Sequence, residues 1–111
     1  MILYGIATCD TCRKARRALA EAGAEVTFRD LRAEPLTPDE RAEFLAAFGD
    51  RLINRSSTTW RGLSETERAA APDALLAAHP TLMKRPVVRA GATLTLGWSA
   101  ATLDDLMAAG A

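Results

Sequence analysis

The chain holds two cysteines, Cys9 and Cys12, in a Cys-x-x-Cys pattern between a short apolar run, residues 2–6, and a helical run, residues 13–22. At a junction between a strand and a helix, the unpaired N–H groups and the positive end of the helix dipole favour a thiolate over a thiol. The i, i+3 spacing across a first helical turn also brings two Cα atoms within bridging range of a disulfide. The pattern therefore predicts a reactive pair in which Cys9 attacks and Cys12 resolves.

Two other interpretations of this pattern remain. A structural zinc site usually takes its ligands from two Cys/His pairs, and His79 is the only further candidate of that kind. Alternatively, both cysteines are small buried hydrophobic residues, which is common for free cysteine. The position of the pair before a helix favours redox or nucleophilic chemistry over both, and we expect no metal site.

Composition excludes several classes of function. The 14 basic and 14 acidic side chains give a formal net charge of zero, and no run of five like charges offers an arm for nucleic acid. No apolar stretch approaches the roughly 18 residues of a membrane span, and the first residues lack the features of a signal peptide. We therefore expect a single cytoplasmic domain, residues 1–111, with no direct contact to nucleic acid or membrane. In that reducing compartment a cysteine pair is more often catalytic or sensing than structural.

The elements that must position the cysteines follow from periodicity. Residues 2–6 predict a short buried strand, and the helical run that follows it ends at Gly23. Alternation in residues 25–29 predicts a second strand, parallel to the first across the helix. Together they form a right-handed βαβ unit.

The second half of the chain predicts an insert and a hairpin. Thr37, followed by a proline and then a glutamate three residues on, marks a helix start within a helical insert at about residues 36–79. Residues 85–89 and 92–96 predict two strands, with the turn between them at Ala90 and Gly91 and a proline at the entry. Residues 99–109 predict a closing helix.

This arrangement is the layout of a thioredoxin-like domain, and five segments extend the likeness. In order they are Tyr4-Gly5-Ile6, Cys9-Asp10-Thr11-Cys12-Arg13-Lys14-Ala15-Arg16, Thr58-Thr59-Trp60-Arg61, Lys84-Arg85-Pro86-Val87-Val88 and Leu96-Gly97-Trp98. Their order and spacing resemble the ArsC/Spx family of glutaredoxin-type arsenate reductases and relatives, most of all its small YffB-type group. The resemblance implies an α/β fold of glutaredoxin/ArsC type, in which helices flank a mixed sheet and a helical insert interrupts the chain.

The resemblance also implies roles for residues near the first cysteine. Cys9 matches the catalytic or sensing cysteine, and Cys12 matches the second cysteine of Spx-type regulators. The backbone N–H groups after Cys9, Thr11 included, would form a cradle for an oxyanion, as helix N-termini do for phosphate-like ions. We expect Arg13 to help stabilise the Cys9 thiolate.

Three further residues acquire roles in the same way. Arg85 matches the arginine that binds the oxyanion beside the thiol, and Pro86 matches the cis-proline that faces the cysteine. Arg55 lies in the segment where the family has an arginine that helps to hold the oxyanion. Trp60 lines the site or, more in keeping with an aromatic residue in a helical insert, packs in the core.

The implied function is that of a thiol-dependent oxidoreductase in which Cys9 forms a mixed disulfide. Glutathione is the expected co-substrate, no bound cofactor is expected, and the partners would be a small-molecule thiol, an oxyanion or a protein disulfide. Arsenate reductases of the family use a third arginine where this chain has Leu96-Gly97-Trp98-Ser99. Because an indole cannot replace a guanidinium fork on a dianion, we expect poor arsenate reduction.

A second function stays open from a different class. Spx-type members are redox-sensing transcriptional regulators that bind RNA polymerase, and the Cys-x-x-Cys pattern is shared with them. In that alternative a disulfide between Cys9 and Cys12 switches binding on or off. The Thr58-Thr59-Trp60 segment favours the YffB-type group instead.

Overall fold

The computed structural model describes residues 1–110 and divides the chain into two compact units. Residues 1–30 and the described residues from 85 onward make the first unit. Residues 31–84 make the second, which contains the predicted helical insert, residues 36–79.

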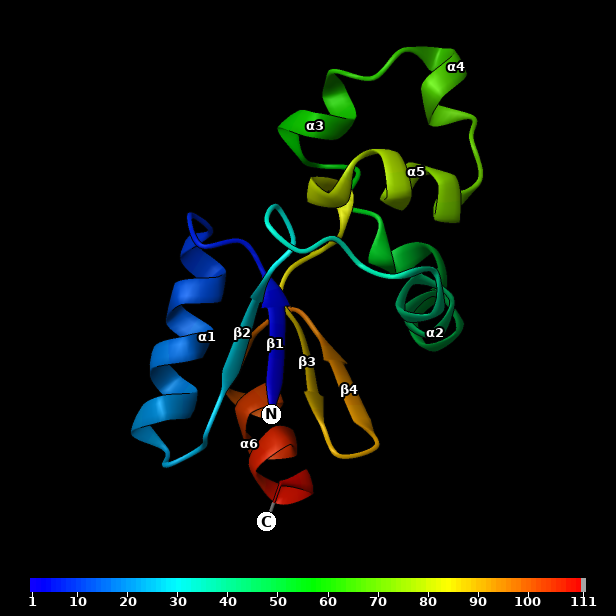
Figure 1. Ribbon diagram of the computed structural model, residues 1–111. Coiled ribbons are helices and arrows are strands. Elements are labelled where there is room, and N and C mark those ends of the chain that lie inside the picture. Colours follow the sequence, from blue (N-terminus) through cyan, green and yellow to red (C-terminus); the bar gives the residue numbers. More distant parts are fainter. Residues whose placement is uncertain (111) are drawn as a thin grey trace. The chain divides into compact units, whose positions relative to one another are not determined.

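The first unit is built on a four-stranded mixed sheet (Figure 1). Its strands are β1 (Ile2–Gly5), β2 (Thr27–Asp30), β3 (Val87–Ala90) and β4 (Thr93–Leu96), in the order β2-β1-β3-β4. β1 runs parallel to β2 and antiparallel to β3, and β3 runs antiparallel to β4. The predicted parallel pair and the predicted hairpin are therefore both confirmed.

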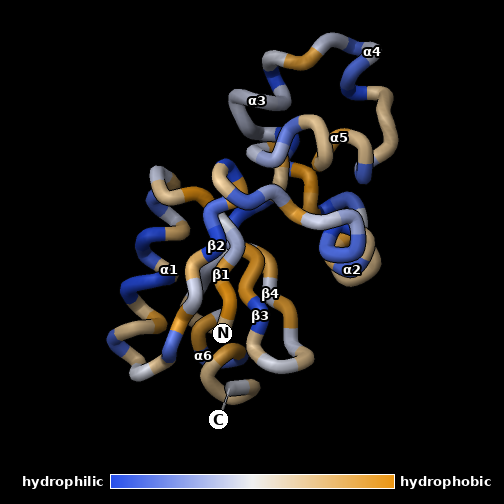
Figure 2. Tube along the Cα trace, in the orientation of Figure 1, coloured by the Kyte–Doolittle hydropathy of each residue, from blue (hydrophilic) through white to orange (hydrophobic). Residues whose placement is uncertain are grey.

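Two helices, α1 (Asp10–Glu21) and α6 (Ala100–Ala109), pack with this sheet. Side chains from the two helices and from β1 and β3 form one core cluster, made of Leu3, Cys12, Ala15, Leu19, Val88, Ala90 and Leu106. Leu3 and Val88 lie opposite each other on β1 and β3, so they point to the same face of the sheet. Along α1, apolar and polar residues alternate in the manner of a helix with one buried side (Figure 2).

Two predicted boundaries shift in this unit. α1 begins at Asp10 rather than at Arg13, because Cys9 is its N-cap and the Arg13 N–H donates to the Cys9 carbonyl at 3.0 Å. An acidic residue in the first turn also suits the helix dipole. The hairpin turn lies at residues 91–92, because Ala90 still pairs with Thr93, and Gly91 takes the positive φ of 59° there.

The second unit is helical. Its elements are α2 (Pro38–Phe48), η1 (Gly49–Leu52), α3 (Thr58–Arg61), α4 (Glu65–Arg68), α5 (Pro72–Ala78) and η2 (Pro80–Leu82). The predicted start of α2 is confirmed as a capping box: the Thr37 hydroxyl accepts from the Glu40 N–H at 3.2 Å, and the Glu40 carboxylate accepts from the Thr37 N–H at 2.8 Å. Its buried side chains include Phe44, Leu52, Leu75, Leu76, Leu82 and Met83.

Residues 1–110 contain neither a candidate membrane span nor a candidate metal site. No helix there combines the length and the apolar character that crossing a membrane requires. Nor does that part of the chain bring together three or more His, Cys, Asp or Glu side chains in a way that would hold a metal ion.

Candidate active site around Cys9

Cys9 lies between the end of β1 and the start of α1, where its backbone is held on both sides. Its N–H donates to the Ile6 carbonyl at 3.0 Å, and its own carbonyl accepts the first hydrogen bond of α1. Both cysteines are free thiols, with Cys9 half-buried and Cys12 completely buried. Cys9 is therefore the more accessible of the two cysteines.

The surroundings of Cys9 favour its thiolate. Partial burial on its own raises the pKa of Cys9, but the other contributions oppose it. The backbone N–H of Cys12, a hydrogen bond from the Arg85 side chain, a hydrogen bond from the Cys12 side chain and the charge of Arg85 all lower it. The resulting pKa of Cys9 lies below that of an ordinary cysteine, which is the property of a reactive thiol.

Cys12 has the opposite character. The pKa of its thiol is raised to about 11, mainly by burial and also by the neighbouring Cys9 sulfur, while the Ile6 N–H and the charge of Arg85 lower it only in part. At neutral pH Cys12 is therefore a thiol whose S–H can donate to the Cys9 sulfur. Cys9 is thus the half-buried cysteine with the lowered pKa, and Cys12 is a buried hydrogen-bond donor.

Arg85 reaches Cys9 from the segment that enters β3. Its guanidinium hydrogen-bonds the Cys9 side chain, so the structure brings these two predicted residues together. The Arg85–Pro86 peptide bond is cis, as the resemblance implied, and Pro86 is buried. The Pro86 carbonyl accepts from the Gly97 N–H at 2.9 Å, which ties this segment to the end of β4.

Thr11 and Arg13 lie in the first turns of α1, and both are exposed. Thr11 is the second residue of the helix, so its backbone N–H is one of those at the helix N-terminus, the end that favours negative charge. The Arg13 guanidinium donates to the Thr8 carbonyl at 3.0 Å and lies 3.3 Å from the Asp10 carboxylate. Arg13 thus braces the loop that carries Cys9.

Arg55 and Trp60 lie in the second unit. The Arg55 guanidinium lies 5.2 Å from the centre of the Trp60 ring and 3.9 Å from the Asp50 carboxylate. Arg68 approaches the same ring at 5.5 Å, so the half-buried Trp60 is contacted by two guanidinium groups.

Trp98, which occupies the segment of the family's third arginine, has a packing role. It is half-buried and packs against the core cluster, together with Leu103 of α6. Ser99 after it is the N-cap of α6 and accepts from the Thr102 N–H at 3.2 Å. The indole therefore helps to pack α6 against the sheet.

Sequence reasoning missed two residues beneath the cysteines, Gly5 and Ile6. The Ile6 N–H hydrogen-bonds the Cys12 sulfur, and Gly5 lies directly against that sulfur. A glycine inside a strand often marks a close approach of another group, and this signal was available in the Tyr4-Gly5-Ile6 segment.

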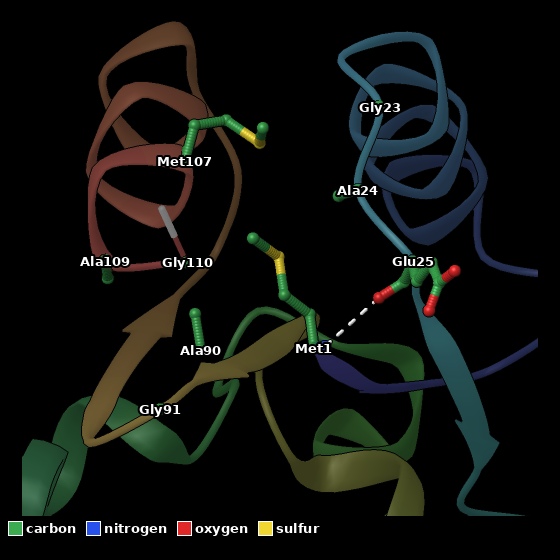
Figure 3. Close-up of a pocket in the computed structure, with 9 residues that line it drawn as sticks. All are labelled: Met1, Gly23, Ala24, Glu25, Ala90, Gly91, Met107, Ala109 and Gly110. Atoms are coloured by element: carbon green, nitrogen blue, oxygen red, sulfur yellow. Dashed lines mark hydrogen bonds between the residues drawn. The ribbon is translucent and has the colours of Figure 1, made fainter.

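A cavity of about 470 Å³ lies near the start of β1, whereas Cys9 follows the end of that strand. The Met1 side chain projects into the space between α6 and the segment after α1 (Figure 3). The residues that line the cavity are Met1, Gly23, Ala24, Glu25, Ala90, Gly91, Met107, Ala109 and Gly110. Glu25 is the one ionisable side chain among them, and no thiol is present, so this cavity is not the site of the cysteine chemistry.

Replacing Arg85 should slow the reaction of Cys9. In Arg85→Ala the thiolate loses a hydrogen bond and a positive charge, so its pKa rises and alkylation by iodoacetamide at pH 7 should be about threefold to tenfold slower. Sulfate should also protect Cys9 less well in the variant. The rate is measured against pH beside Arg13→Ala, which removes an arginine side chain that contacts Thr8 and Asp10 instead. A wild-type alkylation rate and pH profile in Arg85→Ala would contradict the role of Arg85.

Comparisons with known proteins agree with this geometry. The model of the ArsC family matches residues 4–106. A solved YffB protein is 33% identical, covers 99% of this chain and 98% of its own, and superimposes with a TM-score of 0.87, which confirms the predicted α/β, thioredoxin-like fold class. An arsenate reductase-related protein from Brucella melitensis is 35% identical over 96% of this chain and 92% of its own, with a TM-score of 0.74. The global transcriptional regulator Spx of Bacillus subtilis is 30% identical over 87% of this chain and 79% of its own length.

Proposed function

Because this chain belongs to the ArsC family, we propose that it is a thiol-dependent oxidoreductase whose nucleophile is Cys9. The observation that carries the proposal is the contrast between the two thiols. Cys9 is accessible and has a lowered pKa, whereas Cys12 is buried with its pKa raised to about 11. A nucleophilic cysteine reacts as its thiolate, and the lowered pKa of Cys9 enlarges the thiolate fraction.

The proposed substrate is a disulfide that contains glutathione. The Cys9 thiolate attacks the glutathione sulfur, the substrate disulfide breaks, and the substrate leaves as a thiolate that takes a proton from water. A second glutathione thiolate then attacks the glutathione held on Cys9, which forms glutathione disulfide and frees the Cys9 thiolate. In balance, one mixed disulfide and one free glutathione give the substrate thiol and one glutathione disulfide, with no bound cofactor.

Glutathione suits the second step better than Cys12 does. The attacking species in thiol–disulfide exchange is the thiolate, and a thiol with a pKa of about 11 is almost fully protonated at pH 7. Cys12 is also completely buried, so an incoming disulfide cannot reach it directly. Cys12 therefore acts on Cys9 chiefly as a hydrogen-bond donor.

Mass spectrometry of the protein treated with oxidised glutathione tests this function. We expect one glutathione on Cys9 in the wild type and in Cys12→Ser, and none in Cys9→Ser. Loss of the adduct in Cys9→Ser alone would assign the nucleophile, because serine keeps the size of the side chain while removing the thiolate. Modification of Cys12 in Cys9→Ser, or an unmodified wild type, would contradict the proposal.

The alternative is a redox-sensing regulator of the Spx type that binds RNA polymerase. It is favoured by the hydrogen bond between the Cys9 and Cys12 side chains, which places the two sulfurs side by side, and by the likeness to Spx. In that case the treated wild type should carry an internal Cys9–Cys12 disulfide rather than glutathione. Capture of purified RNA polymerase should then differ between the oxidised and reduced forms.

A further inference from the structure

Gly5, the last residue of β1, is a glycine that needs explaining. It pairs with Asp30 of β2, and a glycine inside a strand adds no packing and costs conformational entropy. Such a glycine is usually required either for unusual backbone angles or for space. Among the described residues the glycines with positive φ are Gly23, Gly49, Gly91 and Gly97. Gly5 has no such angle, so it is present for space.

The space over Gly5 is filled by Cys12. A Cβ atom at position 5 would lie 2.5 Å from the Cys12 sulfur, 3.4 Å from the Cys12 Cβ and 3.3 Å from a methyl carbon of Leu3. Heavy atoms that are not bonded settle about 3.5–4.0 Å apart, so a methyl group and the sulfur cannot share this space. Cys12 has little freedom to retreat, because it is completely buried in the core cluster.

The position of the Cys12 sulfur affects the pKa of Cys9. The two side chains are hydrogen-bonded, and this bond is one of the contributions that lower the pKa of Cys9. Hydrogen bonds weaken steeply when the donor moves or tilts. A substitution at residue 5 should therefore change the pKa of Cys9 by displacing the Cys12 thiol, without direct contact with Cys9 or Arg85.

We propose that Gly5 is a positioning residue of this site: its missing side chain leaves the space from which the Cys12 thiol donates to the sulfur of Cys9. The inference deepens the proposed function and rests on it in taking Cys9 as the reacting thiol. It assigns Gly5 no contact with substrate.

The test is the pH profile of Cys9 alkylation in Gly5→Ala. At pH below the pKa the rate follows the thiolate fraction, so displacement of the Cys12 donor should slow alkylation at pH 7 by about threefold to tenfold and move the profile to higher pH. Gly62→Ala is the matched control, because an added Cβ there meets nothing closer than 3.6 Å. The control should keep the wild-type profile.

A double-mutant cycle separates the thiol from a general disturbance of β1. Cys12→Ala removes the sulfur and should slow Cys9 alkylation by itself. Adding Gly5→Ala to it should then change nothing further, because the new methyl group occupies the vacated space. The midpoint of urea unfolding should behave in the same way. Gly5→Ala should lower it in the wild-type background, and adding Gly5→Ala to Cys12→Ala should not lower it further.

The outcomes of these measurements either support or overturn the role of Gly5. An unchanged pH profile in Gly5→Ala, or an equal slowing by Gly5→Ala with and without the Cys12 sulfur, would overturn the inference. If Gly5→Ala alone does not fold, a folded double variant that has the profile of Cys12→Ala supports it, and an unfolded double variant overturns it. Failure of the proposed function is distinct, because it would show as a wild-type Cys9 that takes no glutathione, whatever residue 5 is.

Discussion

Iodoacetamide at pH 7 is expected to alkylate Cys9 faster than Cys12 by a factor on the order of 300 or more. A thiol with a pKa of about 11 is ionised in only about one molecule in ten thousand at pH 7, whereas an ordinary cysteine is ionised in about three in a hundred. The pKa of Cys9 lies below the ordinary value, which widens the ratio, and the burial of Cys12 widens it again.

The measurement is peptide mapping by mass spectrometry after short exposures to the reagent across a range of pH. The rate for Cys9 should rise with pH and level off earlier than for a free cysteine, because a lowered pKa means that the thiolate is complete at lower pH. The rate for Cys12 should still be rising at the most alkaline point. In urea, where the fold and its pKa shifts are lost, the two cysteines should react alike. Faster labelling of Cys12 in the folded protein would reverse the two roles.

Local patterns predicted the parts of this molecule that local interactions stabilise. The capping box of Thr37 and Glu40 needs only residues three apart, and it forms where the sequence placed it. The strand-to-helix junction that carries Cys9 follows from a short apolar run before a helical one. The position of Cys9 at the start of a helix was therefore within reach of sequence reasoning.

The contacts that tune Cys9 are a different matter, since they join residues far apart in the chain. Nothing in the periodicity around residue 85 indicates that Arg85 meets Cys9, and only the family resemblance suggested it. Arg13 is close to Cys9 in sequence, and the contacts of its guanidinium are with Thr8 and Asp10. Proximity along the chain says little about where a long flexible side chain finds its partner.

The burial of Cys12 illustrates the same limit. The spacing of the two cysteines allowed Cys12 to be a resolving thiol, and spacing alone contains no information about solvent exposure. Its pKa of about 11 comes from the core cluster around it, which includes Leu3 of β1 and Val88 of β3. Such a site is assembled by packing, so its chemistry appears only once the sheet and α1 are in place.

The last expected result concerns the choice between arsenate and disulfides. Arsenate is a dianion, and a charge-assisted bond from an arginine to it is worth roughly 1.5–3 kcal/mol, or about tenfold or more in capture. Where family arsenate reductases supply their third arginine, this chain places Trp98 against the core cluster. We therefore expect kcat/KM for arsenate to be about tenfold or more below that of a site with the third arginine, so arsenate reduction should be poor beside the reduction of a glutathione-containing disulfide.

A coupled assay that follows the oxidation of glutathione measures both activities on one preparation, with Cys9→Ser as the blank for each. A disulfide gains nothing from a third arginine, so its reduction should persist and depend on Cys9. Trp98→Arg is a poor gain-of-function test, because it removes an indole that packs against the core cluster, where loss of a large apolar side chain is costly. The test is therefore made on the wild-type protein. Robust arsenate reduction would contradict the expectation. It would show that Arg85 and the N–H groups after Cys9 hold the dianion without a third arginine, and that this chain is an arsenate reductase proper.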